Sequence, residues 1–182
     1  MRIIASLFLM VIFISCADLH QSEQNSRINK LNNQVDSLLI VLNQINDPKL
    51  SLEIKQNQSL LSDLTELYVS DTLLETEAKL IDNYATILGR LSSIKKQMES
   101  IELTLKEQGV ALIKLEKDII NGFGKRNEYD KNLFFEQKKF KKIEIQINRI
   151  KAKKQKTLVN IAFLNLKIRV LQQKKQLKHR QT

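Results

Sequence analysis

The sequence predicts an all-α protein: an elongated antiparallel helical bundle or coiled coil of two to three long helices that follow an N-terminal signal segment. Apolar residues repeat at heptad spacing along most of the chain, which is typical of helices that pack side by side. Lys, Leu, Ile, Gln, Asn and Glu dominate the composition, as in long helices. One proline and four glycines in 182 residues leave little room for the turns of a β-rich fold.

Residues 1–15 are predicted to be a lipoprotein signal peptide. Arg2 precedes an apolar run of about a dozen residues, which suits a signal sequence and is shorter than the roughly 20 residues of a membrane-spanning helix. The run ends in IFISC, residues 12–16, which resembles the lipobox of bacterial lipoproteins, with Phe13 where Leu is usual. This resemblance implies cleavage before Cys16 and a diacylglycerol on its thiol. Cys16 is the one cysteine in the chain, and no cofactor is expected besides this lipid.

Two other interpretations of the N-terminus are an uncleaved apolar anchor and a cytosolic chain whose first helix is hydrophobic. Residues 16–25 are mostly small and polar without an apolar period, and they predict a flexible tether. The helical coiled-coil domain is then expected over residues 26–182, with helices at about 26–46, 50–69, 72–121 and 130–179.

The first two helices of this domain are expected on either side of the proline. Heptad spacing begins at Ile28 and continues through Leu31, Val35, Leu38, Leu42 and Ile45. It stops before Pro48, because the residue that precedes a proline is disfavoured in the α region. Helical spacing then resumes from Ile54 to Tyr68, as a kinked continuation or as a second, shorter helix.

The third helix has the longest apolar seam. Thr72 and Glu75 form a capping-box pattern at its start. Gln108 is the one polar residue in the seam, and such a residue commonly fixes register at some cost in stability. The seam consists of Leu80, Tyr84, Ile87, Leu91, Ile94, Met98, Ile101, Leu105, Gln108, Leu112, Leu115 and Ile119.

The last helix follows the Asn121-Gly122-Phe123-Gly124 stop and carries two apolar stripes. Its seam runs from Phe140 to Leu171, and the second stripe indicates a helix that buries more than one face. That stripe consists of Ile145, Val159, Phe163, Leu166 and Val170. Two helices of about 50 residues joined by a short loop predict an antiparallel hairpin, with residues 26–69 alongside. A heptad seam can equally be satisfied between chains, so a homo-oligomer stays open.

The C-terminal third is strongly basic. From Lys125 to Thr182 there are 18 Lys and Arg against 4 Asp and Glu. The residues predicted to contact a partner or anionic lipid are Lys138, Lys139, Lys141, Lys142, Arg149, Lys151, Lys153 and Lys154. An exported chain rarely meets nucleic acid, so anionic head groups are the favoured ligand. The alternative is pairing within the molecule, against the acidic side chains of residues 60–82.

The chain is expected not to be an enzyme. It has no glycine-rich phosphate loop, no spacing of metal ligands and no nucleophile-elbow pattern. His20 and His179 lie in opposite tails, so neighbours in the sequence cannot form a histidine-based site. The carboxylates of the third helix alternate with lysines, as on a solvated helix face.

The IFISC motif, the polar stretch after it and the helical body with LNNQVDSLLIVLNQINDP (residues 31–48) resemble the plasmid- and prophage-borne lipoproteins of Borrelia spirochaetes. Within that group the chain is most similar to the haemolysin-accessory family BlyB. The resemblance implies an accessory to a small membrane-permeabilising, holin-like protein encoded nearby. It also implies a lipid-anchored location at a cell membrane, with the membrane and its leaflet open.

Two other functions remain open from the sequence. The plasmid-encoded surface lipoproteins of the EppA/BapA type are also helical and lipidated, which implies a surface-displayed module that binds host molecules. A structural spacer between membranes is the third option, since the length of a rod can itself be the function.

Overall fold

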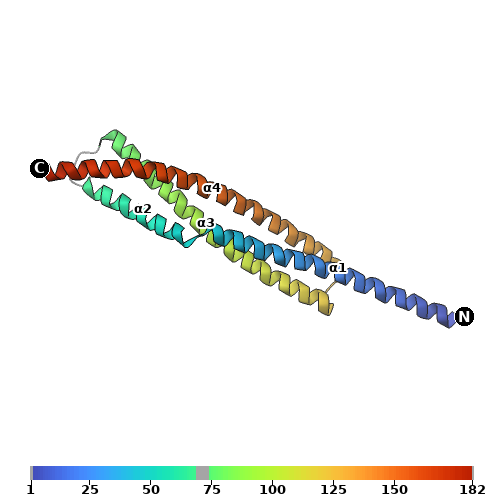
Figure 1. Ribbon diagram of the computed structural model, residues 1–182. Helices are drawn as coiled ribbons and strands as arrows, with labels where there is room; N and C mark the ends of the chain where they lie inside the picture. The colour runs from blue at the N-terminus through green and yellow to red at the C-terminus, as the bar shows by residue number, and fades with distance from the viewer. Residues whose placement is uncertain (1, 69–73, 182) are drawn as a thin grey trace. The chain divides into compact units, whose positions relative to one another are not determined.

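The computed structural model describes the backbone of residues 2–68 and 74–181, and the side chains of residues 20–68, 74–125 and 127–177. These residues form four α-helices and no strand: α1 (Arg2–Ile45), α2 (Pro48–Leu67), α3 (Glu75–Asn121) and α4 (Arg126–Gln181) (Figure 1). The predicted all-α fold class is confirmed. The chain divides into two compact units, of which unit 1 comprises Met1–Val41 with Ile101–Ile145, and unit 2 comprises Leu42–Ser100 with Gln146–Thr182.

Unit 1 is a packed set of three helical segments, from α1, the second half of α3 and the first half of α4. The α3 and α4 segments are antiparallel because the short turn after Asn121 reverses the chain. The α1 segment is parallel to α4, since Arg27 bonds to Asp130 while Gln34 and Leu38 lie beside Phe140. The heptad residues Ile28, Leu31, Leu105, Leu112 and Leu133 of this unit are at most 2 % exposed.

Unit 2 repeats this arrangement with α2 in the place of α1. Asn57 of α2 and Asn165 of α4 both contact Tyr84 of α3, and further along the chain Lys175 of α4 pairs with Glu77. These contacts make α3 antiparallel to α4. Its largest fully buried side chains are Leu50, Leu64, Tyr84, Leu91 and Met98. Each unit therefore buries one apolar stripe from each of its helices.

Local signals explain where the helices begin and end. Asp47 caps α2 by accepting a hydrogen bond of 2.8 Å from the Lys49 amide, and Pro48 takes the first helical position. At the start of α3, the Glu77 carboxylate accepts from the Leu74 amide. The predicted capping residue, Thr72, lies outside the described residues. Gly122 and Gly124 have φ values of 67° and 92°, which glycine adopts without strain, and they end the α3 segment.

The predicted flexible tether over residues 16–25 needs correction. Residues 20–25 belong to α1, which is continuous to Ile45. Gln24 is 3 % exposed, and Gln21 and Gln24 both donate hydrogen bonds to other parts of unit 1. The prediction relied on the absence of an apolar period. This turn of α1 instead contacts the rest of unit 1 through the side-chain amides of glutamines.

The prediction that α4 buries a second face is wrong. Its seam is buried as expected, with Ile161, Leu164 and Ile168 at most 5 % exposed. The second stripe faces outward: Ile145, Val159, Phe163, Leu166 and Val170 are between 43 and 68 % exposed. In each unit the two neighbouring helices contact the side of α4 that carries the buried seam, and none of the segments that the structure describes covers the opposite side.

Candidate membrane- and partner-binding surfaces

Polar contacts join the part of α1 after Cys16 to the rest of unit 1. The side-chain amide of Gln21 donates to the carbonyls of Ile119 and Ile120, at 3.0 and 3.2 Å. Asp130 accepts from Arg27 at 3.0 Å, and its other oxygen lies 3.2 Å from the His20 ring. The side chain of Cys16, the predicted lipidation site, lies outside those that the structure describes.

The turn between α3 and α4 lies at this same end of unit 1. Phe123, between the two glycines of the turn, is 66 % exposed. Tyr129 packs against the turn, since its hydroxyl lies within hydrogen-bond distance of two carbonyl oxygens, that of Asp118 at 3.0 Å and that of Phe123, and can donate to either. Exposed Lys125 follows directly. The turn therefore presents an apolar ring beside a cation, a pairing found where proteins touch membrane interfaces. The sequence predicts Phe123 only as part of a helix stop, although an aromatic residue between two glycines is a signal of an exposed turn.

The predicted basic residues of α4 lie on several sides of the helix. Lys138, Lys139, Lys141 and Lys142 are exposed in unit 1, and Arg149, Lys151 and Lys153 are exposed in unit 2. Two have partners on their own helix: Lys139 pairs with Glu136 at 2.8 Å, and Lys138 lies 4.4 Å from the centre of the Phe134 ring. Such exposed pairs are weak and leave these charges accessible to a ligand.

Lys154 has a different environment from the other predicted basic residues. It is half-buried, and its ammonium donates to the carbonyl of Ile45, the last residue of α1. A cation at this position satisfies a carbonyl that has no partner within its own helix. Lys154 therefore has a structural role at the end of α1, which heptad spacing alone does not reveal.

The acidic residues 60–82 engage the basic helix at one point among the described side chains. Glu77 and Lys175 are 8 and 6 % exposed, and their charged atoms lie 3.6 Å apart. Burial favours the neutral form of Glu77, but the side chain of Tyr68, the Leu74 amide and Lys175 together hold its pKa below the ordinary value. In the described part of the chain, none of the eight predicted basic residues forms an ion pair with this acidic segment.

A groove in unit 2 gathers cations from two helices. It has a volume of about 340 Å³ and runs between α3 and α4. Arg90 of α3 meets Lys153 and Lys156 of α4, with Ser93, Gln97, Thr157 and Asn160 as polar neighbours and no carboxylate in the lining. Such a lining suits a phosphate or carboxylate group. Arg90 was not among the predicted residues, because only the antiparallel packing of α3 on α4 brings it to Lys153.

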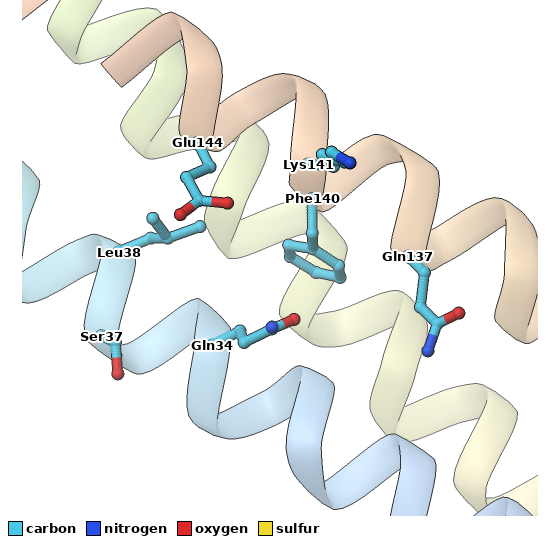
Figure 2. Close-up of a pocket in the computed structure, with 7 residues that line it drawn as sticks. All are labelled: Gln34, Ser37, Leu38, Gln137, Phe140, Lys141 and Glu144. Carbon is cyan, nitrogen blue, oxygen red and sulfur yellow. The ribbon is translucent and has the colours of Figure 1, made fainter. Parts of the chain in front are cut away.

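A second groove, in unit 1, has a volume of about 400 Å³ and lies between α1 and α4. Figure 2 shows the Phe140 ring at its centre, with Gln34 and Leu38 of α1 on one side and Lys141 and Glu144 of α4 on the other. Because the lining carries one cation and one carboxylate, it shows no preference for a charged ligand.

The described residues contain no cluster of three or more His, Cys, Asp or Glu side chains placed to hold a metal ion. None of the helices in this part of the chain combines the length and the hydropathy needed to cross a bilayer. No protein-family model, curated protein sequence or solved structure matches the chain.

Proposed function

We propose that this chain is a non-enzymatic bacterial lipoprotein, held at a cell membrane by a lipid on Cys16, whose helical body serves as an accessory to a membrane-permeabilising, holin- or haemolysin-like system. The observation that carries the proposal is the lipobox pattern at Cys16 followed directly by a packed helix. The accessory role is supported by the resemblance to the BlyB family.

The packing of α1 supports a second role for the lipid. Besides holding the protein at the membrane, it would keep one end of unit 1 close to the membrane surface. Gln21 is five residues from Cys16, a separation of at most about 17 Å even in a fully extended chain. Since Gln21 bonds to Ile119 and Ile120, the turn with Phe123 stays close to the acylated end. An exposed aromatic ring and Lys125 at this position favour contact with the interface of an anionic membrane.

Lipidation is tested first, by labelling cells with a radioactive fatty acid and comparing the wild type with Cys16→Ala. Labelled protein in the membrane fraction of the wild type, with loss of both label and membrane association in the variant, supports the proposal. A wild type without label refutes the lipoprotein assignment.

The position of the turn is tested with tryptophan as a reporter, because the chain contains none. Phe123→Trp in the acylated protein should give blue-shifted fluorescence and quenching by brominated lipids in vesicles that contain anionic lipid. Leu52→Trp is the matched control, since Leu52 is exposed to 56 % on α2 in unit 2. Equal quenching at the two positions contradicts a membrane-facing turn.

The accessory role is tested by co-expression with a short one-span, holin-like membrane protein, the class of partner that the BlyB resemblance implies. Haemolysis or dye release should be greater with the wild-type chain than with Cys16→Ala, and the two proteins should co-purify from the membrane. Lysis that is independent of this chain removes the accessory role while leaving the lipid anchor intact.

A further inference from the structure

The outward side of α4 in unit 2 carries a line of exposed apolar side chains, here called the α4 stripe. It lies opposite the buried seam of the same helix, at successive spacings of 4, 3, 4 and 7 residues. Its members are Val159, Phe163, Leu166, Val170 and Leu177, each between 59 and 68 % exposed. A heptad line of this kind normally packs against another helix.

The outward side of α3 in unit 1 carries a second line, here called the α3 stripe. Its members are Leu103, Val110, Ile113 and Ile120, between 49 and 69 % exposed. Their spacings are 7, 3 and 7, with Lys106 and Lys117 at the intervening heptad positions. Lys106 pairs with Glu102 on the same helix, with its ammonium 2.6 Å from the carboxylate. The two stripes span nearly the same number of residues, about 26 Å of helix each.

The charges beside the two stripes are of opposite sign. Lys167, Arg169 and Lys174 flank the α4 stripe, and the sequence has no Asp or Glu after Glu144. A second α4 would therefore meet only like charges. Glu102, Glu107 and Glu116 flank the α3 stripe, with Lys114 as the one flanking cation. The flanks of the α3 stripe are thus mostly acidic, the sign of charge that α4 needs in a partner, although Lys106 and Lys117 lie within the stripe itself.

We propose that the chain associates with itself, the α4 stripe of one copy packing on the α3 stripe of a second copy. This contact joins two different surfaces, so it is heterologous, and it either closes into a ring or small oligomer or continues along a row of copies. At a membrane, a lipid anchor on each copy raises the local concentration for such contacts. The inference depends on neither the lipid nor the accessory role.

Disulfide trapping tests the pairing in membranes that hold the full chain. Cells should co-express one copy with Val110→Cys and another with Leu166→Cys, followed by mild oxidation and non-reducing electrophoresis. We expect a cross-linked dimer when the two are mixed. The wild type measures any background from Cys16, and Leu52→Cys in place of Leu166→Cys is a control of matched exposure on α2.

Charge reversal provides a second readout. Changing Lys167, Arg169 and Lys174 to Glu on the Leu166→Cys copy should lower the cross-linked fraction by about tenfold, as expected for three exposed pairs. Changing Glu102, Glu107 and Glu116 to Lys on the other copy should restore it. Helicity measured by circular dichroism should stay unchanged in both variants, since all six side chains lie outside the buried seams.

Three results overturn the proposal. One is a mixed sample with no more dimer than the Leu52→Cys control. Another is efficient dimer formation by Leu166→Cys alone, which would mean that α4 pairs with α4. The third is charge reversal that leaves the cross-linked fraction unchanged. Failure of fatty-acid labelling at Cys16 affects none of these outcomes, so the two proposals fail separately.

Discussion

Tyr84 offers the sharpest test of how unit 2 is held together. Its side chain is fully buried, and its hydroxyl donates to Oδ1 of Asn57 at 2.7 Å and also contacts Oδ1 of Asn165. Asn57 is 6 % exposed, and its amide donates to the Glu53 carbonyl at 2.7 Å. One phenol therefore links α2, α3 and α4 through polar groups, of which the Tyr84 hydroxyl and Asn57 are buried and Asn165 is half-buried.

Tyr84→Phe keeps the ring and removes the donor. Because Oδ1 of Asn57 is then buried without a partner, the free energy of unfolding should fall by about 1–3 kcal/mol. The double variant Tyr84→Phe with Asn57→Leu removes both partners and should lie closer to the wild type than the single variant does. Urea unfolding followed by circular dichroism measures both values.

The pH dependence supplies an independent check. Burial raises the pKa of Tyr84 to about 12, against the attraction of Arg169 for the phenolate. With a folded-state pKa above the unfolded value of about 10, the stabilisation by Tyr84 is complete below about pH 10 and is lost as the pH rises towards 12. Tyr84→Phe should lack this part of the alkaline loss. A variant within about 0.5 kcal/mol of the wild type at neutral pH, with the same alkaline loss, would refute the reasoning.

Three further predictions concern single positions. Gln108→Leu should raise the free energy of unfolding by about 1 kcal/mol in denaturant titrations, because Oε1 of Gln108 is buried without a hydrogen-bond partner in a seam that is otherwise apolar; destabilisation would indicate an undetected polar contact. Gly89→Ala should add about 1 kcal/mol to the same quantity, since a Cβ there meets nothing within 4 Å and alanine favours the helix; an unchanged value would contradict this. Glu77 has a folded-state pKa below its ordinary value of 4.5, so its stabilisation is present above that value and is lost as the pH falls through the folded-state pKa. Glu77→Gln should therefore weaken the acid dependence of the melting temperature, and an unaltered acid limb would show that the contact with Lys175 contributes little.

Helix type and most of the buried residues could be predicted because heptad spacing is local. The seam residues from Ile28 to Ile45 in α1 and from Tyr84 to Ile119 in α3 are mostly buried, and Pro48 starts a new helix where its covalent geometry requires it. Heptad spacing did not predict burial correctly for the second stripe of α4. An apolar stripe shows that a helix face is suited to burial, but it does not show whether another helix lies against that face. Val159 and Leu166 are seven residues apart, as are Ile161 and Ile168, yet the first pair is exposed and the second is buried.

Some features of the candidate surfaces could be predicted from the sequence, and others could not. Cys16 and the basic residues of α4 are visible in the sequence as a motif and as a run of charge. Other features depend on contacts between residues 60 or more positions apart, about which spacing carries no information. These are the groove of Arg90, Lys153 and Lys156, and the hydrogen bond from Lys154 to the Ile45 carbonyl. The exposure of Phe123 depends on the geometry of its turn, which spacing does not reveal either.

The sequence by itself determined that this protein is helical, where proline and glycine interrupt it, and which stripe of each helix is apolar, because these depend on backbone geometry within a few residues. The tertiary structure decided which stripes are buried, which cations already have partners, and that the polar residues after Cys16 belong to the continuous helix α1. Those outcomes depend on which helices are neighbours and in which direction they run. Many registers satisfy the same heptads, whereas the polar contacts of Tyr84, Asp130 and Glu77 with other helices each match a single register.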